Sequence, residues 1–250
     1  MRIVTLNTWK CEGDYDRRLA CMADGLAAVA PDVVCLQECF VAAGTDTLSA
    51  LAAATGLRPY ASPAREKTRT FRGRPVTSTS GLGMLVDGEV SGFSRVDFPS
   101  EPRDPERAAQ IVRLATRRGP CAVANLHLTH VPHGETIRGL QLRTVMDALD
   151  AARGDAPGLL CGDFNAEPAD AALAPLRRRP DADWGTESPL ALIGTLLQGT
   201  RSRAIDHIVL IGGRPRGWRL RERRRILDAP DPAGVLPSDH AAVLVDVECC

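Results

Sequence analysis

Carboxylate, carboxamide and imidazole side chains recur beside short apolar runs throughout this chain of 250 residues. Carboxylate and amide oxygens are hard ligands of the kind that Mg²⁺ prefers, and histidine can transfer protons. Together they predict metal-assisted chemistry on a phosphate ester. Five of these residues follow an apolar run and three precede one: Asn7, Glu38, His127, Asp163 and Asn165 in the first group, and Asp206, Asp239 and His240 in the second.

The apolar runs are typical of buried strands, and strand direction decides where their ends meet. The carboxyl ends of parallel strands lie on one edge of a sheet, and an antiparallel neighbour begins at that same edge. We therefore expect the eight side chains to converge, provided that the last two strands run opposite to the earlier ones. The preference of Asp, Asn and His for turns explains any one of these positions equally well. It explains less well why all of them occur together.

Six short motifs contain these residues and occur in order along nearly the whole chain: Thr5-Leu6-Asn7, Leu36-Gln37-Glu38, Asn125-Leu126-His127-Leu128, Gly162-Asp163-Phe164-Asn165, Ile205-Asp206-His207-Ile208 and Ser238-Asp239-His240. This series resembles the endonuclease/exonuclease/phosphatase superfamily, which has the deoxyribonuclease I-like fold. The resemblance implies an α/β (α+β) four-layer sandwich of two facing mixed β-sheets flanked by helices, with the site on one rim. It also implies a metal-dependent phosphoric ester hydrolase of the phosphodiesterase or nuclease type.

The resemblance places the metal-binding glutamate of the family at Glu38. Asp239 is a second candidate ligand, and Asn7 would add a neutral oxygen. One or two carboxylates suffice for Mg²⁺, since it keeps several of its waters and binds substrate phosphate. We expect Mg²⁺ as the cofactor, with Mn²⁺ as a substitute. The plainer interpretation of Glu38 is a carboxylate at the N-terminus of a helix.

Hydrolysis also requires an activated water, charge stabilisation on the phosphorus oxygens and a proton for the leaving oxygen. Asp163 can hold or deprotonate the water, and the amide of Asn165 can bind a non-bridging oxygen. His240 can transfer a proton or contact phosphate as a cation, oriented by Asp206. Family members differ over whether the residue matching Asp163 or that matching His240 is the base, and the sequence leaves both open.

His127 matches a family histidine that contacts the phosphate or the leaving group in deoxyribonuclease I-like and sphingomyelinase-like members. Apurinic-site endonucleases tend to carry tyrosine there, so the residue argues mildly against base-excision repair. Members of this type often have an acid before the strand that matches Gly81–Val86, whereas this chain has Thr77-Ser78-Thr79-Ser80. The partner of His127 is therefore left open, with Glu66 as a weak alternative. A buried histidine bonded to backbone is the plainer interpretation.

Hydrophobic periodicity predicts alternating helices and strands. The helices are expected near residues 16–30, 45–54, 137–152 and 169–178. The strands are expected near residues 3–6, 33–37, 81–86, 109–116, 120–128, 159–161, 204–211, 216–221 and 241–248. Arg138 and Gln141, on the third helix, are expected to brace the site.

Composition favours one domain over residues 1–250, because no linker, repeat or low-complexity tract divides the chain. Lys plus Arg and Asp plus Glu both number 31, and zero net charge argues against strong non-specific binding of nucleic acid. The sequence shows neither a signal peptide nor a membrane span, so we expect a cytoplasmic protein without stable membrane insertion. The expected partner is a phosphate-ester substrate, with nucleic acid or a nucleotide among the candidates. No protein partner is inferred.

Two stretches of the sequence are rich in arginine and lysine. Residues 65–74 are predicted to form a loop, which is either solvated or able to reach over a phosphate-rich substrate. Residues 214–225 alternate arginine with apolar side chains, which is typical of a half-exposed strand.

Three alternatives remain at the level of sequence. The first keeps the enzyme but makes the substrate a lipid or inositol-phosphate headgroup, as in sphingomyelinase-like members. The second is a non-catalytic binding module on the same fold. The third is a zinc hydrolase that uses His127, His130 and His133, although a loop without an accompanying carboxylate is a weak zinc signal.

Overall fold

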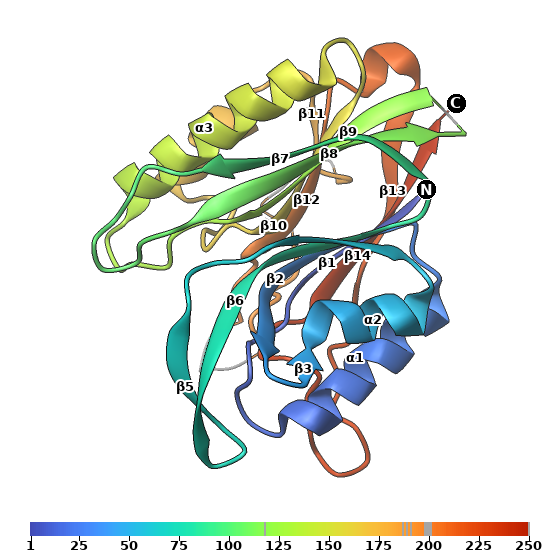
Figure 1. The fold of residues 1–250 in the computed structure, drawn as a ribbon. Helices are drawn as coiled ribbons and strands as arrows, with labels where there is room; N and C mark the ends of the chain where they lie inside the picture. The colour runs from blue at the N-terminus through green and yellow to red at the C-terminus, as the bar shows by residue number, and fades with distance from the viewer. Residues whose placement is uncertain (118, 187, 189, 191, 198–201, 250) are drawn as a thin grey trace.

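The computed structural model describes residues 1–117, 119–186, 188, 190, 192–197 and 202–249. Two β-sheets lie face to face (Figure 1). Helices α1 (Tyr15–Val29) and α2 (Thr47–Thr55) cover the outer face of one sheet, and α3 (Glu135–Arg153) covers the other. The expected four-layer sandwich is confirmed. No helix among the described residues has the length and apolar character needed to cross a bilayer.

The first sheet has eight strands, in the order β13-β14-β1-β2-β6-β4, with β3 beside β2 and β5 beside β6. β1 runs parallel to β2 and antiparallel to β14, as the convergence argument requires. The bounds are β1 (Arg2–Asn7), β2 (Val33–Ala42), β3 (Thr45–Asp46), β4 (Arg58–Ser62), β5 (Lys67–Phe71), β6 (Arg74–Val86), β13 (Trp218–Ile226) and β14 (Ala242–Cys249).

The second sheet has six strands, in the order β11-β12-β10-β9-β8-β7. β10 runs parallel to β9 and antiparallel to β12, so this sheet repeats the arrangement of the first. The bounds are β7 (Glu89–Asp97), β8 (Ala108–Thr116), β9 (Gly119–His127), β10 (Gly158–Asp163), β11 (Ala182–Asp183) and β12 (Asp206–Ile211).

The central strands are apolar on both faces because each sheet is covered on both sides. Side chains alternate along a strand with period two, so neighbours belong to different layers. In β1, Ile3 packs between the two sheets, whereas Val4 and Leu6 pack against α1 and α2. In β9, Val123 lies between the sheets. The residues that alternate with it, Ala122, Ala124 and Leu126, pack under α3. These three apolar layers fix which residues reach the rim.

Amide side chains join the two sheets within the buried interior. Gln37 of β2 donates from Nε2 to Asn125 Oδ1 of β9 at 2.7 Å. Asn125 in turn donates from Nδ2 to the carbonyls of Leu36 and Gly83, each at 2.9 Å. Among these amide groups, Gln37 Oε1 has no hydrogen-bond partner in the described part of the chain. The bonds that the two amide nitrogens and Asn125 Oδ1 do make would be costly to lose, so they favour this arrangement of the two sheets.

The structure corrects two expectations. Residues 65–74 do not form a loop: β5 and the start of β6 make a hairpin, with Lys67 opposite Ser78. The helix expected over residues 169–178 is broken into a 3₁₀ turn (Ala171–Leu173) and the short α4 (Ala174–Arg177). Pro175 lies in the first turn of α4, where its missing N–H is tolerated but a continuous helix is not.

Candidate active site

The predicted residues meet at one rim of the sandwich because of strand register. His127 and Asp163 are the last residues of β9 and β10 and stand opposite each other in parallel register. Asp163 also stands opposite Asp206, the first residue of β12. Register therefore places these three side chains in a row on the second sheet. Asn7, at the end of β1, faces them from the first sheet.

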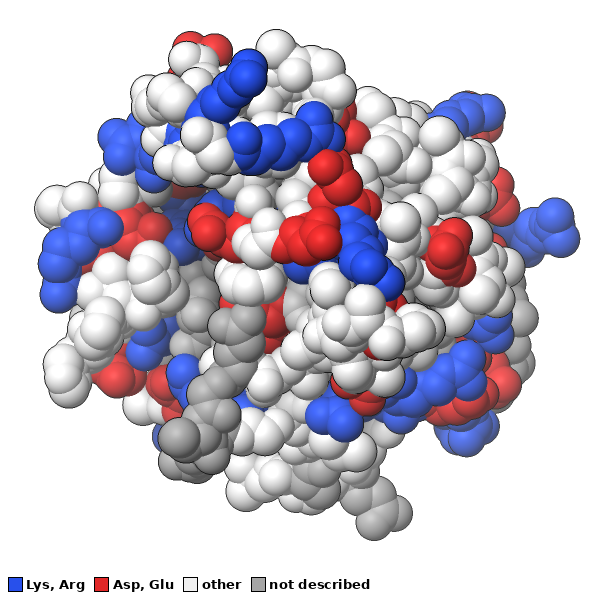
Figure 2. Space-filling view, turned by 90° about the horizontal axis from the view of Figure 1, so that it is seen from below, with Lys and Arg blue, Asp and Glu red and all other residues white. Residues whose placement is uncertain are grey.

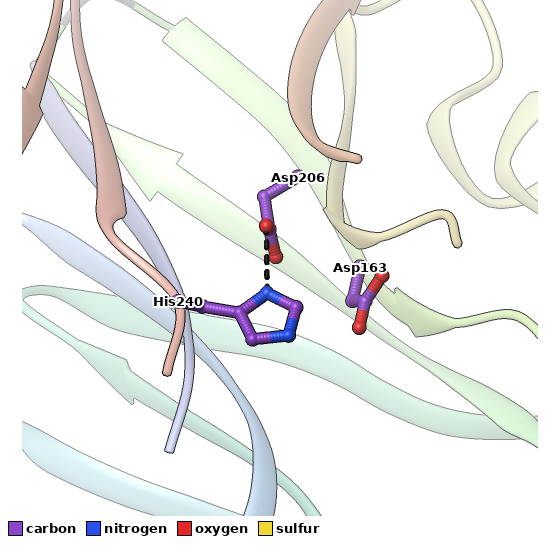
Figure 3. A group of neighbouring side chains, drawn as sticks. All are labelled: Asp163, Asp206 and His240. Atoms are coloured by element: carbon purple, nitrogen blue, oxygen red, sulfur yellow. Dashed lines mark hydrogen bonds and ion pairs between the residues drawn. The ribbon is translucent and has the colours of Figure 1, made fainter. Parts of the chain in front are cut away.

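His240 and Asp206 form a buried hydrogen bond between the two sheets (Figure 3). His240 Nδ1 lies 2.8 Å from Asp206 Oδ2, and the Thr195 hydroxyl donates to the same oxygen at 2.5 Å. The second ring nitrogen of His240 lies on the side facing Asp163. Ligand atoms of Asp163, Asp206 and His240 all lie within 4.8 Å of one another. The pair is thus oriented with one nitrogen held and the other directed at Asp163.

Asp163 contacts three other predicted site residues. Its Oδ2 accepts a hydrogen bond from Asn7 Nδ2 at 3.1 Å and lies 3.4 Å from His127 Nε2. Its Oδ1 accepts the backbone N–H of Asn165 at 2.8 Å. Asn165 has a φ of 47°, and its Nδ2 donates to the Leu128 carbonyl at 3.0 Å, which leaves one amide hydrogen for another acceptor.

Glycine is required immediately before Asp163. Gly162 has a φ of 146°, and an added Cβ would lie 2.0 Å from the Leu126 carbonyl oxygen. The close approach of β9 and β10 at this point brings His127 and Asp163 together.

Burial and neighbouring charges set the protonation of the site. Burial and the negative charge of Asp206 raise the pKa of Asp163 to about 6. Burial alone would lower the pKa of His240, but the charge and hydrogen bond of Asp206, with Asp163 and Asp239, raise it to about 10. Burial and the positive charge of Arg107 lower the pKa of His127. At neutral pH the site therefore holds a cationic His240, a carboxylate at Asp163 and a neutral His127.

Glu38 sits at a β-bulge in β2, where the register with β6 shifts between Leu36 and Cys39. Its φ of 58° is unusual for a residue other than glycine, and such bulges turn a side chain away from the regular alternation. The carboxylate pairs with Lys10 Nζ at 3.0 Å, and Lys10 and Trp9 also have positive φ values of 44° and 56°. The backbone is thus strained where the first sheet presents its charged residues.

The residues predicted to bind metal provide oxygen donors that fit a hard divalent cation. Burial and the negative charge of Glu38 both raise the pKa of Asp239, so these carboxylates repel one another. The Asn7 backbone pairs with Gln37, and its carbonyl accepts the Ser238 hydroxyl at 2.6 Å, so Asn7 lies next to the neighbours of both carboxylates. Its Oδ1 accepts the Trp9 N–H at 3.0 Å, which leaves a lone pair. Two repelling carboxylates and an amide oxygen match the ligands that Mg²⁺ prefers.

Arg18 is a site residue that sequence reasoning missed. This α1 side chain is 1% exposed and donates to five carbonyl oxygens at 2.9–3.2 Å. Four acceptors lie in the segment after β1 (residues 8, 9, 10 and 12), and the fifth is Pro237, two residues before Asp239. One guanidinium therefore holds the segment that follows Asn7 and the segment that precedes Asp239, two of the three predicted metal ligands. The available signal was its place on the buried stripe of the helix with Tyr15, Met22 and Leu26.

Arg138 and Gln141, which were expected to brace the site, bond to the loop that precedes α3. Gln141 Oε1 accepts the Thr129 N–H at 2.9 Å, and Arg138 Nη1 donates to the carbonyls of Thr129 and Val131. They hold the loop that follows His127.

The three histidines considered for zinc do not form a metal cluster within the described residues. His127 contacts Asp163, whereas His130 is 62% exposed and its Nδ1 lies 3.0 Å from Asp104 Oδ2. Asp104 is the acid of this loop region: burial would raise its pKa, but hydrogen bonds from His130 and Arg107 lower it. The sequence left the partner of His127 open, and in the structure this partner is Asp163. No contact between His127 and Glu66 is seen in the described part of the chain.

The family model described as "Endonuclease/Exonuclease/phosphatase family" matches residues 4–240, which include all eight predicted site residues. The chain belongs to the endonuclease/exonuclease/phosphatase family. This family commonly includes metal-dependent phosphoesterases and nucleases.

Solved structures share the fold of this family member at low sequence identity. A humanized Danio rerio TDP2 is 18% identical with a TM-score of 0.76, covering 99% of this chain and 98% of that one. The human Nocturnin catalytic domain is 18% identical with a TM-score of 0.74, covering 100% and 93%. An endonuclease/exonuclease/phosphatase from Beutenbergia cavernae is 21% identical with a TM-score of 0.74, covering 100% and 71%. None of the curated proteins compared with the chain matches it in sequence.

We predict that Arg18→Lys loosens the segment after β1, because an ammonium cannot reach five carbonyls at once. Amide hydrogen exchange of residues 8–12 should rise by at least about tenfold, corresponding to a local loss of about 1.4 kcal/mol. Exchange in α3, on the opposite face, should stay unchanged. Unaltered protection of residues 8–12 would show that Arg18 does not hold them.

His207 should make stability depend on pH. Its Nε2 donates to the Ala166 carbonyl at 3.0 Å, and burial with the charge of Arg223 lowers its pKa to about 4. The unfolded chain takes up this proton near pH 6.5. The stability that neutral His207 contributes to the fold is therefore complete above pH 6.5 and is lost as the pH falls towards 4. The free energy of unfolding should fall by about 3 kcal/mol over this pH range. In urea unfolding, His207→Gln should flatten the decline between these pH values, whereas His133→Gln, at an exposed histidine, should not. Equal slopes in all three proteins would contradict this.

Proposed function

We propose that this protein is a divalent-metal-dependent phosphoric ester hydrolase of the phosphodiesterase or nuclease type. The observation that carries the proposal is the meeting of Asp163 with Asn7, His127 and the Asp206–His240 pair at one buried rim. Family membership supports it. The whole chain, residues 1–250, would act as one domain, and a cytoplasmic location stays a prediction from sequence.

Glu38, Asp239 and Asn7 would hold the ion, which we propose is Mg²⁺, with Mn²⁺ as a substitute. When bound, the ion would neutralise charge on the phosphate oxygens and orient the ester. The cluster of Asp163, Asp206 and His240 also has ligand spacing. We assign it to proton transfer instead, because Asp206 Oδ2 and His240 Nδ1 already share a hydrogen bond that a cation would have to displace.

Asp163 would hold the attacking water and take its proton as the P–O bond forms. Its hydrogen bonds from Asn7 and Asn165 fix the carboxylate in place, so it can orient water without moving. The remaining amide hydrogen of Asn165 would bind a non-bridging oxygen without adding negative charge.

His240 would act on the leaving group. Asp206 fixes its Nδ1, so the opposite nitrogen can contact a phosphate oxygen and give its proton to the leaving oxygen as that P–O bond breaks. His127, beside Asp163, would hydrogen-bond the phosphate or the leaving group. This division makes Asp163 the base and His240 the acid.

Hydrolysis should require both metal and Glu38. Purified protein would be assayed on bis-p-nitrophenyl phosphate, single- and double-stranded DNA, RNA, sphingomyelin and inositol phosphates, with Mg²⁺, Mn²⁺ or EDTA. We expect turnover that EDTA abolishes, and a rate at least about 100-fold lower for Glu38→Gln, which keeps the shape but removes the charge.

The matched control is Glu89→Gln, at an exposed carboxylate at the start of β7. It should retain the wild-type rate. Full activity of Glu38→Gln in EDTA would overturn the metal-dependent mechanism, and a folded protein that turns over none of these substrates would favour the binding-module alternative.

A further inference from the structure

A pocket of about 440 Å³ opens beside the proposed catalytic rim and shares Glu38 and His127 with it. Seven of its lining residues are Lys or Arg and four are Asp or Glu. The chain as a whole carries 31 of each, and on the face in Figure 2 the two signs are interspersed. The pocket is therefore a local excess of positive charge next to the reacting groups.

Most cations of the pocket already have a carboxylate partner. Arg107 pairs with Asp104 at 2.7 Å and Arg65 with Glu106 at 3.5 Å. Arg95 and Arg103 pair with Asp97 and Glu101, and Lys10 pairs with Glu38. These pairs reduce the charge that each side chain can offer to a ligand.

Arg69 and Lys67 are different. Arg69 donates to the carbonyl and hydroxyl of Ser78 at 3.0 and 2.9 Å, and to the Ser80 hydroxyl at 2.8 Å. These acceptors are neutral, so they fix the guanidinium without cancelling its charge. No carboxylate pairs with Lys67 in the described part of the chain, and burial with the charges of Arg65 and Arg69 lowers the pKa of Lys67. An anion placed here would relieve the repulsion among these cations.

The wall that carries these two side chains is held in place by the β5–β6 hairpin. Lys67 and Arg69 are two residues apart in β5 and therefore project from the same face. At the end of the strand, the Phe71 ring packs edge-on to Tyr15 at 5.3 Å between ring centroids and against Phe40 at 5.0 Å. The packed hairpin and the bonded Arg69 guanidinium are preorganised, so these parts need little ordering when a ligand binds.

We propose that Lys67 and Arg69 bind a second, non-reacting phosphate of the substrate. This inference rests on the proposed hydrolase function and narrows its substrate class. The scissile ester would lie at the rim among Asp163, His127 and His240, and a phosphate monoester elsewhere on the same small molecule would enter the basic pocket. Both a nucleotide and a phosphorylated sugar alcohol supply this chemistry.

Two substrates that differ only in the second phosphate test the proposal. They are thymidine 5′-(p-nitrophenyl phosphate) and its 3′-phosphorylated form. We expect the wild-type enzyme with Mg²⁺ to prefer the phosphorylated form by about tenfold or more in kcat/KM, mainly through KM. The preference should shrink with added salt, since it depends on charge. Lys67→Met keeps the apolar part of the side chain but removes its charge. This variant should reduce the ratio of the two kcat/KM values towards one.

Arg74→Met is the matched control, at an exposed arginine on the same hairpin outside the pocket. It should keep the wild-type preference. If both esters are cleaved with metal at equal kcat/KM, the hydrolase function stands and the second-phosphate site is wrong.

If neither ester is cleaved, binding measurements test the second-phosphate site independently of the hydrolase function. Calorimetric titration would compare thymidine 3′,5′-bisphosphate with thymidine 5′-phosphate, and inositol 1,4-bisphosphate with inositol 1-phosphate. Tighter binding of either bisphosphate that Lys67→Met abolishes would support the pocket and identify the nucleotide or the sugar alcohol as its ligand. Equal affinities within both pairs would overturn it.

Discussion

The hydrogen bond between His240 and Asp206 depends on how the two sheets close against each other. His240 comes from the segment before β14 in the first sheet, and Asp206 begins β12 in the second. The contact between Asn7 and Asp163 crosses the same gap. Neither sheet alone assembles the site, so its geometry depends on the sheet-to-sheet packing. The hydrogen bond between the buried amides of Gln37 and Asn125 favours that packing, because a shift of either sheet would break it.

The rim also concentrates features that oppose stability. Carboxylates are buried near one another, and four non-glycine residues there (Trp9, Lys10, Glu38 and Asn165) have positive φ values. Such strain persists only where the surroundings enforce it. Arg18 supplies much of that enforcement by joining the segment after β1 to Pro237 through buried hydrogen bonds. The charged side chains of the rim are thus held in place by a residue that lies behind them in α1.

Local rules could predict the strand ends that form the rim, whereas the two facing sheets were implied by the resemblance to a known family. Apolar runs bounded by Asp, Asn or His locate strand ends, and strand direction then brings Asp163, Asp206 and His240 together. Sequence alone could not predict the β5–β6 hairpin, whose alternating Lys and Arg lack the apolar pattern of a strand because one face is exposed. It also missed Thr195, which binds Asp206 from a segment without regular periodicity. Interactions that join residues far apart in sequence, such as that of Arg18 with Pro237, leave no local pattern to read.

The proposed mechanism places the metal on the first sheet and centres proton transfer on the second. The most direct measurement is the anomalous diffraction of crystals of this protein soaked in Mn²⁺. We expect a peak beside Glu38 and Asp239, which disappears in Glu38→Gln crystals. A peak bonded to Asp163, Asp206 and His240 in place of that position would contradict the proposed mechanism, because those side chains could not then act as the proposed acid and base.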